Sequence, residues 1–231
     1  MKVIILIEDR ITRQAIFLKK FGKNPAELEN EFENLKNIAG GQEFDDFKNK
    51  IESQDWSALD EYKVLILHRS AFAQSSRQSI IQYCKERKKR LVFFSGGISA
   101  SVYSESIGFP FLTLNSQDFY SNNLVTFLNH AKQGDYNLLI LSFGERWELN
   151  ILMNLNLKIV KLLNHENLGA KISKEEVIQK ISLEGLAKQT LKKNNIEIDW
   201  LDNDLINDPK KKLLGLQKDL KTLINNKIFS V

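Results

Sequence analysis

Cysteine and histidine are scarce in this sequence, and their scarcity excludes several kinds of site. The chain of 231 residues has one cysteine, Cys84, so it cannot form an internal disulfide. Its three histidines, His68, His130 and His165, are too few for a site built on several imidazoles. A chain without a disulfide framework or a zinc-type cluster is typical of a reducing compartment, so a cytoplasmic location is expected. No metal or cofactor is expected.

Long apolar segments are lacking as well. Val3 to Ile7 form an apolar run of five residues, which ends at two acids, Glu8 and Asp9. This run is too short for the core of a signal peptide, and no later run reaches the length of about 18 residues that a membrane-spanning helix needs. No membrane association is therefore expected. Hydrophobic residues still make up 42% of the chain, which is enough for a buried core.

No segment of the sequence concentrates positive charge as strongly as nucleic-acid binding usually requires. Residues 1–150 carry 19 basic and 19 acidic side chains, whereas residues 151–231 carry 14 lysines and 10 acids and so hold the whole net charge of +4. The densest basic run, Lys85 to Arg90, is interpreted as the solvated last turn of a helix, with docking of an acidic partner as the alternative. DNA binding by the lysine-rich second part is the least favoured function.

The first part of the chain does contain a series of short apolar runs separated by helical segments. The predicted strands cover residues 3–7, 64–67, 91–94 and 111–114. The predicted helices cover residues 11–21, 25–39, 44–51 and 77–89, and another begins near residue 124. Short, wholly apolar strands that alternate with helices are typical of a parallel sheet with helices on both faces. The pattern therefore predicts an α/β fold of the flavodoxin-like kind.

The sequence changes in character after Gly134, where we predict a boundary between a domain of residues 1–134 and a mostly helical domain of residues 135–231. Helices are predicted over residues 145–163, 174–193 and 210–225, and short strands over residues 138–141 and 196–201. The segment is long enough for a small core of its own. Its apolar stripes are expected to be buried against the first domain, a partner or a second copy; they include Leu149, Leu152, Ile159, Leu213, Leu216 and Leu220.

Polar residues directly follow each strand predicted in the first domain. They are Glu8 and Asp9, then His68 with Arg69, then Ser95 with two glycines, and finally Asn115. The carboxyl ends of parallel strands meet at one edge of a sheet, and ligands of such folds bind in the crevice there. These polar residues are therefore the candidates for a functional site.

The order of these strand ends resembles the receiver domain of bacterial response regulators. In that family an acidic pair after the first strand holds Mg²⁺ and an Asp after the third accepts a phosphoryl group, while a Ser or Thr and then a Lys follow the next two strands. Glu8 and Asp9 match the acidic pair, and Ser95 matches the hydroxyl. His68 stands where the family has the phospho-accepting Asp, and Asn115 stands where it has the Lys.

These two departures imply a pseudo-receiver, since an imidazole and an amide replace the carboxylate and the ammonium that the phosphorylation chemistry needs. The resemblance covers residues 1–132, although residues 10–60 are predicted to be helical throughout and lack the second strand of the family. It implies a non-catalytic signalling or regulatory adaptor that binds a protein partner, or itself, through residues 135–231. The alternative is an enzyme or sensor that binds a nucleotide or phosphate in the strand-end crevice.

Two of the candidate segments allow more than one interpretation. Ser95, Gly96, Gly97 and Ser99 form a candidate anion-binding loop if they open a helix and expose backbone N–H groups, or else a tight turn that needs glycine at positive φ. His68 is interpreted as a structural residue bonded to the acids or to Ser95. Its alternatives are a general base for Ser70 and a metal ligand beside Glu8 and Asp9.

Overall fold

The computed structural model describes residues 2–99, 102–169, 172–173, 177, 185–201 and 208–229. The chain divides into two compact units, residues 1–145 and 146–231. This division falls after the boundary expected near Gly134, because helix α7 (Leu139–Phe143) packs against other helices of the first unit. Among the described residues, no helix combines the length and the apolar character needed to cross a membrane.

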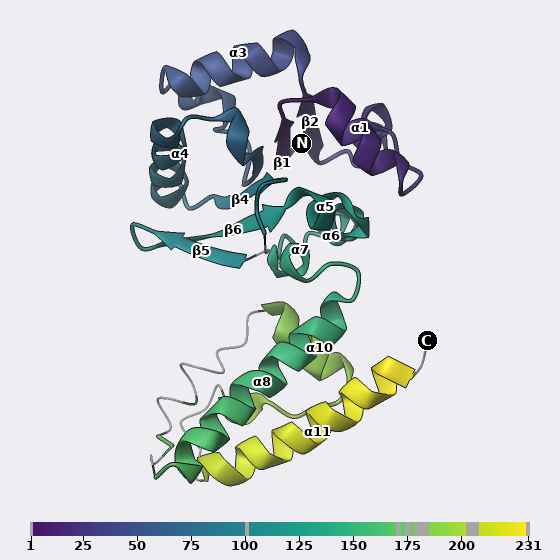
Figure 1. Ribbon diagram of the computed structural model, residues 1–231, viewed down its shortest axis with the longest axis vertical. Helices are drawn as coiled ribbons and strands as arrows, with labels where there is room; N and C mark the ends of the chain where they lie inside the picture. The colour runs from purple at the N-terminus through teal and green to yellow at the C-terminus, as the bar shows by residue number, and fades with distance from the viewer. Residues whose placement is uncertain are drawn as a thin grey trace. The chain divides into compact units, whose positions relative to one another are not determined.

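A six-stranded sheet forms the centre of the first unit (Figure 1). Its strands are β1 (Ile4–Glu8), β2 (Leu35–Ala39), β3 (Val64–His68), β4 (Arg90–Ser95), β5 (Val102–Ser106) and β6 (Phe109–Asn115). They lie in the order β2-β1-β3-β4-β6-β5, and all neighbours are parallel except β5, which runs antiparallel to β6 at the edge. The predicted flavodoxin-like α/β fold is therefore confirmed.

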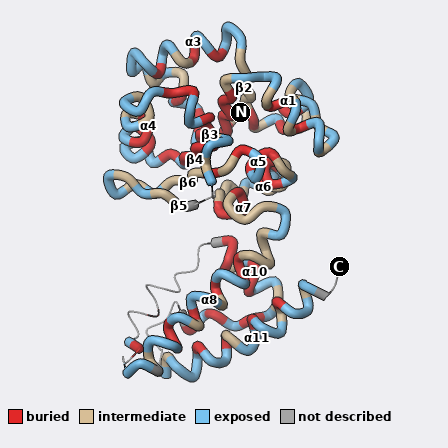
Figure 2. The backbone as a smooth tube through the Cα atoms, in the orientation of Figure 1, coloured by how far each residue is buried: buried red, intermediate tan, exposed pale blue. Residues whose placement is uncertain are grey.

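Helices cover both faces of this sheet, which explains why its central strands are apolar throughout. The remaining helices of the unit are α1 (Ile11–Lys19), α2 (Pro25–Glu31), α3 (Gly41–Glu52), α4 (Gln74–Glu86), α5 (Ser116–Tyr120) and α6 (Asn122–Lys132). On one face, α3 and α4 bury side chains such as Phe47 and Ile80 against the odd-numbered residues of β3 and β4. On the other face, Phe119 and Tyr120 of α5 pack on Phe94 of β4. Figure 2 shows how the buried residues concentrate along the strands.

Strand β2 corrects the prediction of one helix over residues 25–39. Helix α2 begins at Pro25 as expected but ends at Glu31, and Leu35 and Ile38 lie in a strand. β2 pairs with β1 in parallel, from Ile4 opposite Leu35 to Glu8 opposite Ala39. The spacing of the apolar residues fits a helix. However, β2 pairs with the edge of β1, and the stability gained from this tertiary pairing outweighs the local helical pattern. The second strand missing from the predicted receiver-like order is therefore present.

Three further predictions of local structure are wrong. Residues 138–141 form part of α7 rather than a strand, because a short apolar run also fits a buried helix. The loop after β4 leads to strand β5, not to a helix, and this strand was not predicted. Residues 196–200 alternate in burial as in an edge strand, but they pair with no strand in the described part of the chain, and residues 199–201 form a 3-10 helix, η3 (Asp199–Leu201).

The second unit is helical in its described part, as predicted, and buries its apolar stripes within itself. Its elements are α8 (Trp147–Asn167), α10 (Gly185–Lys193), η3 and α11 (Pro209–Phe229). α8 packs along α11, and their shared core contains Leu152, Ile159, Leu213, Leu216 and Leu220. Burial of these side chains therefore requires neither a partner nor a second copy. Residues 174–176 and 178–184 of the predicted helix 174–193 lie outside the described residues.

Two glycines give a matched test of where this backbone needs glycine. Gly40 has φ +65° and ψ −171°, and an added Cβ would lie 3.3 Å from the amide nitrogen of Ile11. Gly97 has no positive φ and open space around it, which overturns the idea that the Gly96–Gly97 turn depends on glycine. We expect Gly40→Ala to lower the free energy of unfolding by about 2 kcal/mol and Gly97→Ala to change it by less than about 0.5 kcal/mol. Urea unfolding of both variants measures this difference, and equal values would contradict it.

Candidate functional site

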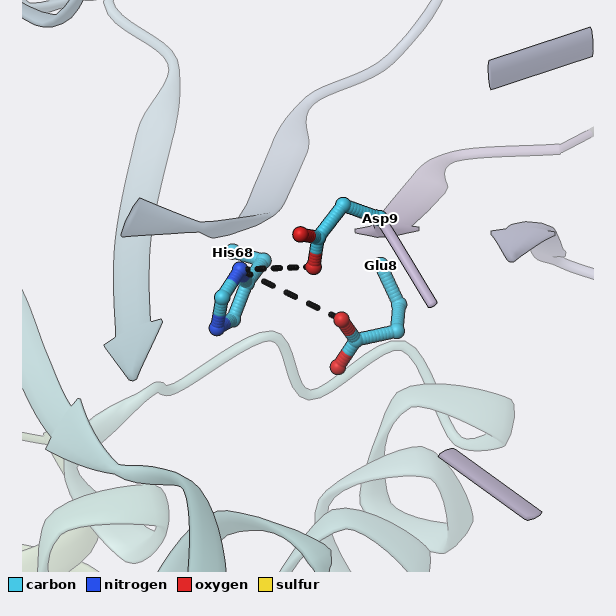
Figure 3. A group of neighbouring side chains, drawn as sticks. All are labelled: Glu8, Asp9 and His68. Carbon is cyan, nitrogen blue, oxygen red and sulfur yellow. Dashed lines mark ion pairs between the residues drawn. The ribbon is translucent and has the colours of Figure 1, made fainter. Parts of the chain in front are cut away.

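The candidate site lies at the carboxyl ends of β1 and β3, which are neighbours in the sheet. β1 ends at Glu8, which Asp9 follows, and β3 ends at His68. Because the two strands are parallel, their ends meet at one edge, and Figure 3 shows the imidazole facing both carboxylates. His68 Nδ1 lies 2.9 Å from Asp9 Oδ1 and 4.0 Å from Glu8 Oε1. Three of the predicted site residues therefore do meet.

Arg13, which is not among the residues predicted from the strand ends, completes this group. It lies in the first turns of α1, four residues after Asp9, so its side chain reaches back to the end of β1. The Arg13 guanidinium donates to both acids. Its Nε donates to Glu8 Oε1 at 3.1 Å, and its Nη2 donates to Glu8 Oε1 and to Asp9 Oδ1. The same Nη2 lies 3.2 Å from His68 Nδ1. A cation that belongs to the chain therefore sits among the three predicted residues.

The other carboxylate oxygen of Glu8 is bound from α5. The Tyr120 hydroxyl donates to Glu8 Oε2 at 3.0 Å, and Gln14 Nε2 lies 3.4 Å from that hydroxyl. Gln14 also exchanges two side-chain hydrogen bonds with Asn37 of β2, at 2.9 and 3.0 Å. Both oxygens of Glu8 therefore have donors, and the polar groups around it extend into a network that joins β1, β2, α1 and α5.

Aromatic rings bury this network and set the protonation of Glu8. Tyr120 stacks on Phe17 at 5.4 Å and meets Phe94 edge-on at the same separation. Burial in these surroundings raises the pKa of Glu8 to about 7, against the lowering effect of Arg13. Burial likewise raises the pKa of Tyr120 well above its usual range. One guanidinium cannot neutralise two carboxylates. Near neutral pH, partial protonation of Glu8 therefore removes part of the negative charge that Arg13 leaves unbalanced.

His68 is a neutral side chain at physiological pH. Burial, followed by the positive charge of Arg13, lowers the pKa of His68 to about 4. Burial also acts to raise the pKa of Asp9, but the hydrogen bond with Glu8, the charge that His68 carries only at acidic pH, and the charge of Arg13 outweigh it and lower that pKa. The ionised Asp9 carboxylate lies 2.9 Å from His68 Nδ1, so the neutral ring sits directly beside a negative charge.

This geometry does not support His68 as a general base for Ser70. A base of this kind needs its free nitrogen aimed along a hydrogen bond to the nucleophile. Ser70 Oγ lies 3.2 Å from Nδ1 and 3.5 Å from Nε2, so it is almost equidistant from the two ring nitrogens and aligned with neither lone pair. The interpretation of His68 as a structural residue beside the acids fits better, with Asp9 rather than Ser95 as its neighbour.

A divalent cation does not fit the site as it is arranged. Ligand atoms of Glu8, Asp9 and His68 lie within 4.8 Å of one another, which is close enough for one metal ion. However, Arg13 donates to both carboxylates from within this group, and its guanidinium would repel an incoming cation. The positive charge beside these two acids is therefore supplied by the chain itself, and no chemistry is assigned to a metal here.

Ser95 and Asn115 end the next two strands along the sheet and are engaged in local contacts. They face each other in the register of β4 and β6. Ser95 Oγ accepts from the amide of Gly97 at 3.4 Å, and the Asn115 side chain accepts from the amide of Gln117 at 2.8 Å as the cap of α5. Asn115 Nδ2 also donates to the carbonyl of Ile98. These contacts hold the loop after β4 and the start of α5.

Comparisons of the chain with protein-family models, with curated proteins and with solved structures found no match. The chemistry of the site is therefore judged from its own geometry.

Proposed function

We propose that this chain is a non-catalytic signalling or regulatory adaptor with a receiver-like first unit, in which Arg13 takes the place of a bound divalent cation. The observation that carries the proposal is the guanidinium that donates to both Glu8 and Asp9. A receiver needs these two acids free to hold its metal ion. Here the acids are already paired within the chain, so the site is suited to holding β1, α1 and β3 together rather than to phosphoryl transfer.

The strand order supports the receiver-like assignment. The candidate residues stand at the carboxyl ends of β1 (Glu8 and Asp9), β3 (His68), β4 (Ser95) and β6 (Asn115). In chain order these are the first, third, fourth and fifth parallel strands of the sheet. These are the positions at which the receiver family carries its acidic pair, phospho-acceptor, hydroxyl and Lys. At the phospho-acceptor position His68 offers a neutral imidazole 2.9 Å from Asp9, not the carboxylate oxygen that accepts the phosphoryl group.

The output of the adaptor is proposed to lie in residues 135–231, through a protein partner or through self-association. The second unit supports this role because it has its own core and so presents a folded surface. That surface includes Met153 and Leu157 of α8, which lie one helical turn apart and are 43% and 57% exposed.

Acetyl phosphate provides the test of the proposed function. Incubation of the full chain with acetyl phosphate and Mg²⁺ should leave its intact mass unchanged, because neither the metal nor a carboxylate acceptor is available. A receiver domain of known activity, treated in parallel, controls for the reagent. A stable adduct of one phosphoryl group on a carboxylate, about 80 Da, would show an active receiver and overturn the proposal.

A further inference from the structure

The connection from β4 to β6 leaves part of one sheet face without a covering helix among the described residues of the first unit. Parallel neighbours in such sheets are usually joined through a helix that packs on the sheet. Here the described part of the connection is a loop and the antiparallel strand β5 (Figure 1). On the face shared with α4, β5 presents Ser104 and Ser106 beside Phe111 of β6, and all three are only partly buried. Small hydroxyl side chains on a sheet face that no helix covers indicate a surface made for contact with something polar.

A cavity of about 580 Å³ occupies this place, between α4 and the β5–β6 pair. Its volume lies in the range of roughly 300 to 1,000 Å³ that is usual for small-molecule sites. The apolar part of its lining comes from Ile81, Phe93, Ile98 and Phe111. Lys85 of α4 connects this helix to the β5–β6 turn, because its Nζ donates to the carbonyl of Ile107 at 2.6 Å.

One end of the cavity is strongly positive. Arg69 and Arg77 both line it, and among the described residues no carboxylate belongs to its lining. Within the described part of the chain, neither arginine forms an ion pair. Arg77 Nη1 donates to the carbonyl of Phe72 at 2.6 Å, which holds the side chain beside Arg69, and burial together with the charge of Arg69 lowers the pKa of Arg77. Two neighbouring guanidiniums that share no acid are expected to attract an anion.

The start of α4 adds to this positive end. Ala73 at the N-cap gives no side-chain cap, and the first turn of the 13-residue helix contains no acid. Neither an N-cap side chain nor a first-turn acid therefore satisfies the first N–H groups of the helix and its positive dipole end. Gln74, Arg77 and Gln78 from the first turns of this helix line the cavity, opposite Gly97 and Ser99 of the loop after β4.

We propose that this cavity binds a small molecule of nucleotide size through a phosphate group, which Arg69 and Arg77 contact at the start of α4. The remainder of the ligand lies along Phe111 and the hydroxyls of Ser104 and Thr113, which are 2.8 Å apart. Gly97 and Ser99 of the predicted anion-binding loop take part as one wall. This site is separate from the group around Arg13, and it neither requires nor excludes the proposed adaptor function.

Binding in this cavity should not depend on a metal ion, because no carboxylate lines it to share one. Titration of the full chain, in the presence of EDTA, with nucleoside mono- and diphosphates, with the corresponding nucleosides and with pyrophosphate tests the inference. A saturating nucleotide should raise the melting temperature by on the order of 5 °C. Pyrophosphate should compete with the nucleotide, and the uncharged nucleosides should give no shift. No shift with any phosphate-bearing probe, or equal shifts with the nucleosides, would overturn the proposal.

A pair of charge-reversal variants assigns the binding to this cavity. Arg69 is exposed, so Arg69→Glu should fold normally, and it should weaken nucleotide binding on the order of 10- to 100-fold. Arg87→Glu, at the exposed end of the same helix and outside the cavity, makes the same change in net charge and should leave the affinity unchanged. If Arg69→Glu alters the circular dichroism spectrum, Arg69→Gln replaces it, with a smaller loss expected. Equal affinities of the Arg69 and Arg87 variants would show that the site lies elsewhere.

Discussion

Replacing Arg13 with methionine is expected to lower the free energy of unfolding at pH 8 by about 3 to 5 kcal/mol. Methionine retains much of the apolar stem but removes the donors shared by Glu8 and Asp9. Glu8 is fully buried, so its charge would then remain unpaired or be lost to a proton. Protonation of Glu8 at pH 5 removes the repulsion between the Glu8 and Asp9 carboxylates. The variant should therefore lose less stability at pH 5 than at pH 8. Urea unfolding of the variant and of the wild type at both pH values measures this.

The same variant should acquire a response to divalent cations that the wild type lacks. With the guanidinium gone, Glu8, Asp9 and His68 offer ligand atoms within 4.8 Å of one another. Mn²⁺ suits this set because it accepts carboxylate ligands readily and tolerates imidazole. Millimolar Mn²⁺ should therefore raise the melting temperature of Arg13→Met but not that of the wild type.

Arg10→Met is the matched control for both measurements. Arg10 also pairs with Asp9, at 3.8 Å, but its side chain is 71% exposed, so its loss should cost less than about 1 kcal/mol. It should create no response to Mn²⁺, since Arg13 stays in place. If the wild type binds Mn²⁺ as tightly as Arg13→Met does, Arg13 does not act as a substitute for the cation and the proposed locking of the site is wrong.

The strands that could be predicted from the sequence are those whose apolar pattern is set by burial alone. β1, β3 and β4 lie at the centre of the sheet, and their unbroken apolar runs are visible without any knowledge of neighbours. β2 and β5 lie at the two edges, where a strand contains polar residues and depends on its partner for stability. Leu35 and Ile38 fit a helical spacing as well as a strand, and only pairing with β1 decides between them.

The site was predictable where strand ends alone determine it. Glu8, Asp9 and His68 meet because parallel strands carry their carboxyl ends to one edge, and this follows from the order of the strands. Arg13 had a signal that was overlooked, namely a cation four residues after an acid at the start of a helix. Tyr120 had none, since it reaches Glu8 from 112 residues away through the packing of a short helix.

Glu8 and His68 are expected to give opposite dependences of stability on pH. The folded pKa of Glu8, about 7, is raised from 4.5, so the folded state binds more protons and stability falls as pH rises from about 4.5 to about 7. The folded pKa of His68, about 4, is lowered from 6.5, so the unfolded state binds more protons and stability rises between about 4 and 6.5. Each shift corresponds to roughly 3 kcal/mol. In the wild type the two effects largely cancel between about pH 4.5 and 6.5.

Single substitutions should separate these two slopes. In Glu8→Gln only the slope of His68 remains, so the free energy of unfolding should rise with pH from about 4.5 to 6.5. In His68→Asn only the slope of Glu8 remains, so it should fall from about 4.5 to 7. The carboxyl groups of Asp9, Glu29 and Glu148 have lowered pKa values and therefore act mainly below this window. Urea unfolding in steps of pH, with each variant compared with the wild type, isolates the contributions. Slopes of the same sign in the two variants would contradict this expectation. They would show that Glu8 stays ionised beside Arg13 and that burial is not the dominant influence on the pKa of Glu8.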